Sequence, residues 1–449
     1  MQHLLKKSFI VFILFILIAS ISVGEESTPK LNNHLKDQNL ATTEKNNQIK
    51  KIPSEEELLF PISNLFQNIS FSMYYDEKSN QFLPKDNLPS QTSESSHPLQ
   101  EKNITTTLQL ASVGDIMCHN TQYISARKTS TNGTYDFSSC FDPIKSYISS
   151  ADVAIGNLET TFSGKEKKYS SYPAFNTPEQ LGTTLKDIGF DILATANNHS
   201  LDKRNYGIIH TLDTLDNLAI KHTGTFRNKE ERDALLIETI KDIKMAFMSY
   251  TYGTNGIPIP KENPSAINII NKEEMLKDIK KAKDNQVDVI IFSLHFGQEY
   301  QRKQNKHQEE LVNFLFENGV DIVLGGHPHV IQPAKMKEVT TIDGEKKNCF
   351  VIYSQGNLVA DQKRKYTYSG LITLLDITKN LETNQTEITN VSFVPTWVDK
   401  SSTKRGLDFR ILPVEKAITD YEEKKDPLLS SRDYKRLKEV LIETKAQIF

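Results

Sequence analysis

The chain has 449 residues, a formal net charge of −3 and a hydrophobic content of 37%. The near-neutral charge argues against a nucleic-acid binder held by bulk electrostatics. Three cysteines are too few for a disulfide framework. The sequence has no second long apolar run, which argues against a polytopic membrane protein.

The first 24 residues read as a segment for export or membrane anchoring. Lys6 and Lys7 precede an apolar run over 8–23. Its length lies between the roughly 7–15 residues of a signal-peptide core and the roughly 20 of a spanning helix. We therefore expect 1–24 to be a cleaved signal peptide or a retained membrane anchor. Either would place the rest of the chain outside the cytoplasm.

Residues 25–103 are rich in Asn, Gln, Ser, Lys and Glu and show no sustained periodicity. This composition predicts a polar, largely disordered spacer. Two apolar patches, Leu58–Phe66 and Phe71–Tyr75, could instead dock onto a folded domain.

From about residue 104 the chain alternates apolar runs with helical patterns. The runs are nearly continuous, as in strands buried on both faces. They are Leu108–Val113, Asp152–Gly156, Phe190–Ala196, Val287–Leu294, Val320–Gly326 and Cys349–Ser354. Helical patterns lie at Tyr206–Leu218, Lys272–Lys283 and His307–Asn318. The alternation predicts an α/β layered domain over 104–400.

The last segment, 401–449, is predicted to complete this domain. Phe409–Val414 reads as a final strand. Ser431–Lys445 reads as a helix, because its apolar residues recur at spacings of three and four. Docking on the domain is the plain interpretation, and contact with a partner in a membrane assembly is the alternative.

Each predicted strand ends in a compact polar group drawn from Asp, Glu, Asn and His. In open α/β sheets, ligands bind beyond the carboxyl ends of the strands, so we expect these groups to converge. Carboxylates, amide oxygens and imidazoles suit divalent metals, and the sequence has no cysteine-pair motif of a structural zinc site. The set predicts a dinuclear site of Mn, Fe or Zn that activates water, with a nearby histidine as acid.

The polar motifs have a fixed order along the chain. They are Gly114-Asp115-Ile116-Met117, Asn157-Leu158-Glu159, Asn197-Asn198-His199-Ser200-Leu201-Asp202, His295-Phe296-Gly297-Gln298-Glu299-Tyr300, Gly326-His327-Pro328-His329-Val330-Ile331-Gln332 and Tyr353-Ser354-Gln355-Gly356-Asn357. Together they resemble the CapA family of poly-γ-glutamate capsule biosynthesis proteins, a branch of the calcineurin-like metallophosphoesterase superfamily. The resemblance covers about Leu108 to Val398. It implies a four-layer α/β/β/α metallophosphoesterase-like sandwich with two divalent metal ions at the strand ends.

The resemblance also implies roles for individual residues. Metal ligands would be Asp115 and His329 for the first ion, Asn198, His295 and His327 for the second, and Glu159 as the bridge between them. His199 would be the catalytic acid that protonates the leaving group. Residues expected to face the substrate or support the ligands are Asn157, Glu299 and Asn357.

One position departs from the wider superfamily. The third place of its first motif is His, but here it is Met117, a feature that the CapA branch shares. Methionine is a poor ligand for hard divalent ions. Glu159 in place of Asp also lengthens the bridging arm. His119, two residues further on, could compensate as a ligand or could be an exposed loop residue.

Several other residues have competing interpretations. Asp202 is predicted to start the helix after His199 rather than to bind metal, and His199 could itself cap that helix. Cys118 and Cys140 could form a disulfide in an exported protein. The basic cluster 363–365 could attract a polyanion or be a solvated loop.

Two functions stay open on the sequence. The first is an exported CapA-like protein of cell-surface polymer biosynthesis or export, acting as a dinuclear-metal-dependent hydrolase. Its partners would be an anionic polymer or phosphoester substrate and a membrane-bound synthase or export assembly, with no nucleic acid. The alternative is a non-catalytic envelope component that binds and guides an anionic polymer. Both are extracytoplasmic, secreted or tethered by the N-terminal segment.

Overall fold

The computed structural model describes residues 71–76, 81–84, 104–130, 133–403 and 406–448. The predicted export segment 1–24 and the apolar patch Leu58–Phe66 lie outside the described residues. Among the helices of the described part, none is both long and apolar enough to cross a membrane.

The first sheet has ten strands within the described residues. Its order is β2-β1-β15-β14-β3-β4-β5-β6, with β13 beside β3 and β16 beside β15. The bounds are β1 Phe71–Asp76, β2 Gln81–Pro84, β3 Thr105–Ile116, β4 Val153–Leu158, β5 Ile192–Ala194, β6 Lys221–Thr223, β13 Asn357–Val359, β14 Ser369–Asn380, β15 Thr386–Thr403 and β16 Gly406–Pro413. Strands β3 to β6 run parallel, so their carboxyl ends share one edge.

The second sheet has six strands in the described part, in the order β11-β12-β10-β9-β8-β7. The bounds are β7 Leu236–Ile240, β8 Ile243–Thr251, β9 Val289–His295, β10 Ile322–Gly326, β11 Ala334–Thr340 and β12 Lys346–Ile352. Strands β8, β9, β10 and β12 are parallel. This sheet therefore also has an edge at which carboxyl ends gather.

The two sheets pack face to face around one apolar core. Leu110 and Phe393 of the first sheet share a buried cluster with Phe247, Ile291 and Phe350 of the second. The rings of Phe350 and Phe393 lie 6.5 Å apart across the interface. This contact explains why the strands are apolar on successive residues: one face meets the other sheet and the other meets helices.

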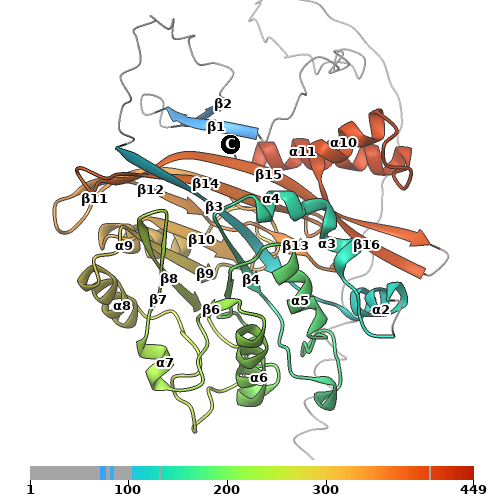
Figure 1. Cartoon of the computed structure of the whole chain (residues 1–449), viewed down its shortest axis with the longest axis horizontal. Helices are drawn as coiled ribbons and strands as arrows, with labels where there is room; N and C mark the ends of the chain where they lie inside the picture. Colours follow the sequence, from blue (N-terminus) through green and yellow to red (C-terminus); the bar gives the residue numbers. More distant parts are fainter. Residues whose placement is uncertain (1–70, 77–80, 85–103, 131–132, 404–405, 449) are drawn as a thin grey trace, which may run out of the picture. The chain divides into compact units, whose positions relative to one another are not determined.

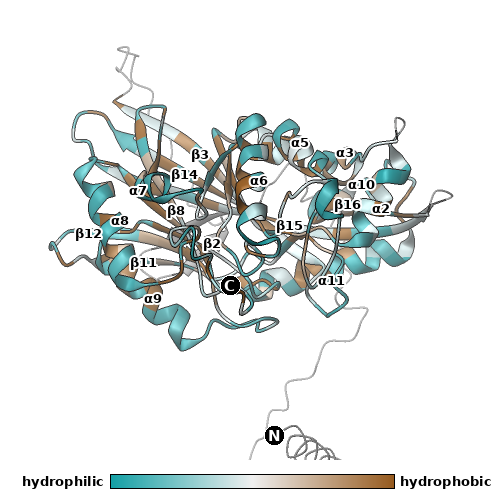
Figure 2. Cartoon of the chain, turned by 90° about the horizontal axis from the view of Figure 1, so that it is seen from below, coloured by the Kyte–Doolittle hydropathy of each residue, from teal (hydrophilic) through white to brown (hydrophobic). Residues whose placement is uncertain are grey.

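Helices cover the two outer faces (Figure 1). The helices on the first sheet are α2 Asn120–Thr129, α3 Ser138–Phe141, α4 Lys145–Ser149 and α5 Gln180–Asp187. Those on the second sheet are α8 Lys272–Asp284 and α9 Lys306–Glu317. Figure 2 shows the apolar strands between these more hydrophilic helices. The predicted four-layer α/β/β/α sandwich is thereby confirmed.

Local signals fix where α8 and α9 begin. The side chain of Asn271 accepts hydrogen bonds from the backbone N–H groups of Glu273 and Glu274. Asn305 and Gln308 form a reciprocal capping box at the start of α9. Both helices then bury an apolar face on the second sheet.

The remaining helices complete the domain. They are α6 Arg204–Asn217, α7 Lys229–Asp233, α10 Val414–Glu422 and α11 Ser431–Ile448. Leu437 and Val440 of α11 pack with Trp397 of β15. Ile448 reaches the core between the sheets. The predicted docking of the C-terminal helix on the domain is confirmed.

The six predicted strands all form, as β3, β4, β5, β9, β10 and β12, and the three predicted helices form as α6, α8 and α9. One apolar patch of the expected spacer, Phe71–Tyr75, lies in β1, which pairs with β15 from Phe71 opposite Phe393. This segment therefore pairs with the folded domain, as the docking interpretation expected.

No disulfide forms among the three cysteines, all of which lie in the described residues. Cys118, Cys140 and Cys349 are free and buried. Burial raises the pKa of the Cys118 thiol to about 12, so the thiol stays protonated. The predicted alternative of a Cys118–Cys140 bridge is not seen.

Candidate metal centre

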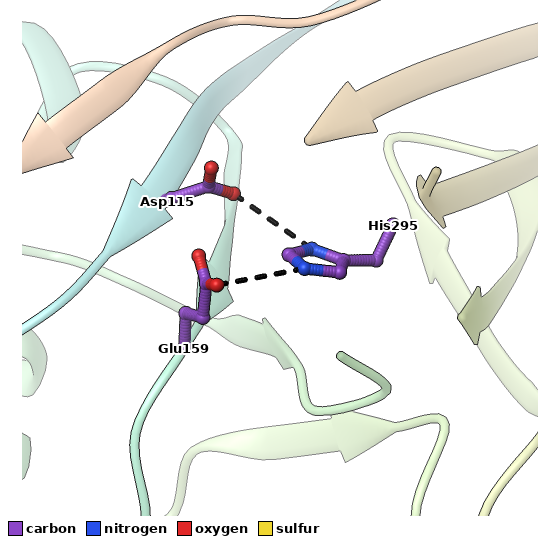
Figure 3. Close-up of side chains that lie close together, drawn as sticks. All are labelled: Asp115, Glu159 and His295. Carbon is purple, nitrogen blue, oxygen red and sulfur yellow. Dashed lines mark ion pairs between the residues drawn. The ribbon is translucent and has the colours of Figure 1, made fainter. Parts of the chain in front are cut away.

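Strand ends from both sheets meet at one buried place. Asp115 is the penultimate residue of β3 and lies opposite Asn157 of β4, and His295 ends β9 opposite Gly326 of β10. Glu159 follows β4 directly. The side chains of Asp115, Glu159 and His295 are almost fully inaccessible, and one ligand atom from each lies within 4.8 Å of the others. Figure 3 shows the His295 imidazole facing both carboxylates.

Glu159 lies between two groups of donor atoms. Its Oε1 is 3.5 Å from Nε2 of His295, which in turn is 3.0 Å from Oδ1 of Asn198. Its Oε2 is 3.8 Å from Nδ1 of His329, which lies 3.1 Å from Oδ2 of Asp115. The two carboxylate oxygens thus face different sets of potential ligands.

Three of the donor atoms lack the hydrogen bonds that buried polar groups normally make. Among the described residues, neither oxygen of Glu159 has a hydrogen-bond partner, nor does Nδ1 of His327. The His327 ring lies 4.8 Å from that of His295. A buried carboxylate without a partner is costly, and a bound cation would remove the cost.

Burial sets the protonation states of the site. Burial, and then the charge of Asp115, raises the pKa of Glu159 well above its ordinary value. Burial lowers the pKa of His295 well below the usual range and that of His327 to about 3. The two imidazoles are therefore neutral near pH 7, the form that binds metal.

The residues present fit divalent metal ions. They offer carboxylate, amide oxygen and imidazole donors, the types that bind Mn, Fe and Zn. Donor atoms that share an ion at about 2.0–2.2 Å lie roughly 3–4.4 Å apart, and the pairs around Glu159 fall in this range. The orphaned oxygens of Glu159 complete the match.

The turn after β10 is built around the Asp115 carboxylate. The backbone N–H of His327 donates to Asp115 Oδ2 over 3.1 Å. A Cβ at Gly326 would lie 2.5 Å from Asp115 Oδ1, so only glycine leaves room. His327 and His329 both have positive φ, +96° and +57°, which is strained for residues with a side chain. Both rings are buried.

His199 is paired with Asp202. Nδ1 of His199 donates to Asp202 Oδ2 over 2.7 Å, and the backbone N–H of Phe175 donates to the same oxygen over 2.6 Å. The prediction that Asp202 starts the following helix is wrong. Helix α6 begins only at Arg204, after Lys203, without a side-chain cap. The alternative in which His199 caps that helix is not seen either.

The supporting residues divide into buried and exposed ones. Asn157 Nδ2 donates to Asp115 Oδ1 over 2.7 Å, and Asn357 Oδ1 lies 3.1 Å from Nδ1 of His329. Both asparagines are buried and orient ligand candidates. Glu299 is exposed, outside the donor cluster.

Met117 and His119 are both engaged outside the donor cluster. Met117 is buried in a small apolar cluster with Phe175 and Ala360. His119 Nδ1 accepts a hydrogen bond from the Asp361 backbone N–H over 3.1 Å. Burial lowers the pKa of His119 to about 4. His119 is neither an exposed loop residue nor part of the described cluster of metal-binding side chains.

Two residues at the site were not anticipated. Tyr252, with 46% of its surface exposed, lies with its ring 4.5 Å from that of His327. Asn255 Oδ1 accepts from Asn198 Nδ2 over 3.2 Å. Both follow β8, a strand whose sequence also ends in a polar group. The same strand-end signal used elsewhere would have found them.

The family match covers the part of the chain that carries the six motifs. The family described as "Bacterial capsule synthesis protein PGA_cap" matches residues 109–362. The chain is 27% identical to the capsule biosynthesis protein CapA of Bacillus anthracis over 265 residues, which cover 57% of this chain and 60% of that protein. It is also 27% identical to the PGA biosynthesis protein CapA of Bacillus subtilis over 315 residues, covering 68% of this chain and 77% of that protein.

Among solved structures, an NAD nucleotidase from Haemophilus influenzae is similar at 13% identity with a TM-score of 0.42, covering 76% of this chain and 60% of that one. The fold and site define a layered α/β protein with a buried cluster suited to divalent metal. The chain belongs to the family of bacterial capsule synthesis proteins that PGA_cap describes.

Proposed function

We propose that this protein is an exported, divalent-metal-dependent hydrolase of cell-surface polymer biosynthesis. One observation carries the proposal above the others. The Glu159 carboxylate is buried between two donor groups, and neither of its oxygens has a hydrogen-bond partner in the described part of the chain. A carboxylate in this setting fits a bridge between two ions.

Six residues would hold the ions. Asp115 and His329 form one group, Asn198, His295 and His327 form the other, and Glu159 stands between them. Divalent ions in such a site supply Lewis-acid activation of water and of a phosphoryl or carbonyl oxygen. Asn157 and Asn357 keep Asp115 and His329 oriented for this role.

His199 would move the proton to the leaving group. Because Asp202 engages Nδ1, the nitrogen available to the substrate is Nε2. The Phe175 ring packs edge-on against the His199 ring, with 4.7 Å between centroids, and limits its rotation. Asp202 thereby fixes both the tautomer and the direction of the ring.

The family and the site support an anionic substrate. The relatives are named for capsule and PGA biosynthesis, so an anionic polymer such as poly-γ-glutamate is the favoured substrate. The metal chemistry serves a phosphoester equally well. The lysines and apolar run before residue 24 support an extracytoplasmic location, secreted or tethered.

Hydrolysis assays on the purified full chain test this proposal. Poly-γ-glutamate and bis(4-nitrophenyl) phosphate are offered with Mn²⁺, Fe²⁺ or Zn²⁺. We expect turnover of at least one substrate, and a loss of about 100-fold or more in His199→Ala. His307→Ala is the matched control, because His307 is exposed on α9. Equal rates in the parent and His199→Ala would contradict the proposed role.

A non-catalytic envelope component that binds and guides an anionic polymer is the second candidate. Met117 favours it: the place of a histidine ligand holds a methionine packed against Phe175 and Ala360. This candidate predicts polymer binding without metal-dependent turnover, unaffected by His199→Ala.

A further inference from the structure

Two loops that leave the candidate metal centre carry a group of basic side chains. One loop follows β9 and the other follows β13. Their basic residues, which we call the basic rim, are Arg302, Lys303, Lys363, Arg364 and Lys365.

Both loops are attached to the site by hydrogen bonds. The Tyr300 backbone N–H donates to the carbonyl of Pro328 over 2.8 Å. Asn357 Nδ2 donates to the carbonyl of Thr367 over 2.8 Å. The rim is therefore held beside the His327-Pro328-His329 turn.

The two arginines of the rim stack on tyrosines across the loops. The guanidinium carbon of Arg364 lies 4.1 Å from the centre of the Tyr300 ring, and that of Arg302 lies 4.0 Å from the Tyr366 ring. The Tyr300 ring is 6.1 Å from that of His329. One aromatic ring thus separates Arg364 from a ligand candidate. Stacking uses the face of a guanidinium and leaves its N–H edge able to bind a carboxylate or phosphate.

The charge of the rim is incompletely neutralised. Four other arginines, Arg227, Arg232, Arg410 and Arg436, pair with carboxylates. In the described part of the chain, no carboxylate lies within ion-pair distance of Arg302 or Arg364, whereas Lys365 pairs with Glu443 over 3.4 Å. Arg302 Nη2 donates to the Glu443 carbonyl over 2.9 Å.

One acidic side chain shares the mouth of the site. Glu299 is exposed on the same loop as Tyr300. Burial and the charge of Glu299 raise the pKa of the Tyr300 hydroxyl to about 12. Glu299 lies beyond ion-pair distance of both arginines, so it does not occupy their N–H edges.

We propose that Arg302 and Arg364 form a subsite for an anionic group of the substrate, a carboxylate or a phosphate, on the His329 side of the metal centre. This inference rests on the proposed function, because it takes the centre as the reacting site. An anionic polymer laid across the centre would place a neighbouring charged unit on the rim. The stacked guanidinium groups would bind that unit at little cost in side-chain entropy.

Equilibrium binding to the full chain tests the subsite. One probe is a fluorescently labelled short oligomer of γ-linked glutamate, and the other is labelled inorganic polyphosphate. We expect Arg364→Gln and Arg302→Gln each to weaken binding of at least one probe by about tenfold, the loss typical of one charge-assisted contact. Arg364→Lys keeps the charge but loses the planar fork, and should fall between Arg364→Gln and the parent.

Arg432→Gln is the matched control. It removes the same charge from an exposed residue at the start of α11, and about 16 Å of helix rise separates it from Glu443. We expect it to change affinity by less than about twofold, as for a distant surface charge. The probe that loses more affinity identifies the group bound, and equal losses indicate a subsite for either anion.

Three results would overturn the inference: no binding of either probe by the parent, unchanged binding in both rim variants, or an equal loss in Arg432→Gln. Arg364→Gln separates folding from binding, because the described structure shows no hydrogen bond from its guanidinium, and its melting temperature should match that of the parent. Hydrolysis is followed in parallel. Rim-dependent binding without turnover would refute the hydrolase alone, whereas metal-dependent turnover with rim-independent binding would refute the subsite alone.

Discussion

Asp202 accepts a hydrogen bond from His199, with 2.7 Å between Oδ2 and Nδ1. Both side chains are almost completely buried. The pairing fixes the tautomer of His199, the proposed acid, and the direction of its ring. It also gives Asp202, which the sequence suggested as the start of a helix, a role in positioning His199.

Asp202→Asn tests this pairing. Loss of the carboxylate should lower kcat by about 100-fold, because the imidazole loses its fixed tautomer. Metal content should not change, since Asp202 contacts none of the ligand candidates through the described hydrogen bonds. Asp213→Asn on α6, a surface residue paired with Arg227, is the control and should leave kcat as in the parent. A loss of metal in Asp202→Asn would contradict the assignment.

Glu159→Gln should stabilise the metal-free protein near pH 7. The pKa of Glu159 is higher in the folded state than in the unfolded chain. The side chain therefore favours folding at low pH, where it is protonated, and this contribution to stability is lost as the pH rises through the folded-state pKa. Removing the charge removes this penalty, and Tm should rise by about 2–5 °C. Adding Mn²⁺ should raise Tm in the parent and not in the variant. A lower Tm in metal-free Glu159→Gln would show that the carboxylate is satisfied without metal.

The affinity for divalent metal should fall as the pH is lowered. Metal requires the carboxylate form of Glu159, whose raised pKa keeps it protonated at higher pH than an ordinary carboxyl. His327, with a pKa of about 3, adds no proton competition near neutrality. Titration calorimetry with Mn²⁺ should show Kd rising by up to about tenfold per pH unit below the Glu159 pKa. A flat profile between about pH 5 and 8 would refute this linkage.

Gly326→Ala should disturb the centre without replacing any proposed ligand. Its Cβ would lie 2.5 Å from Asp115 Oδ1, so the carboxylate or the turn must move. We expect a stability cost of about 1–3 kcal/mol and weaker metal binding. Gly253→Ala is the control, because no atom lies within 4 Å of its added Cβ. Parent-like metal affinity in Gly326→Ala would show that Asp115 is not held where the structure places it.

Met117→Leu asks whether the methionine only packs. Met117 lies with Phe175 and Ala360, and leucine conserves most of its volume. We expect a stability change below about 1.5 kcal/mol and unchanged metal content. Loss of metal from a folded variant, measured by elemental analysis, would instead identify the thioether as a ligand.

The sequence predicts much of the site because strand ends carry a strong pattern. His295 and His327 follow apolar runs that suit buried strands, and the register of β9 and β10 then brings the two histidines together. Tyr252 was missed because the run before it, β8, was not recognised as a strand. Asp202 was misassigned because an aspartate after a loop resembles a helix cap, and only the folded chain shows His199 facing it.

The pairing of β1 with β15 in the first sheet could not be predicted from the sequence either. Strand β1 lies in a polar stretch, and its pairing with β15 joins residues more than 300 positions apart in the chain. The stacking of Arg302 on Tyr366 and of Arg364 on Tyr300 joins two loops that follow strands of different sheets. No local sequence pattern predicts such a contact.

Elemental analysis of the purified full chain tests the central claim most directly. After exposure to Mn²⁺, Fe²⁺ or Zn²⁺ and removal of excess metal, we predict two ions per chain, lost in Glu159→Ala and retained in His307→Ala. One ion per chain would show that Asp115 and His329 provide too few ligands to hold the first ion when position 117 is methionine rather than histidine. A folded parent that holds no metal would contradict the metal centre and leave polymer binding as the function.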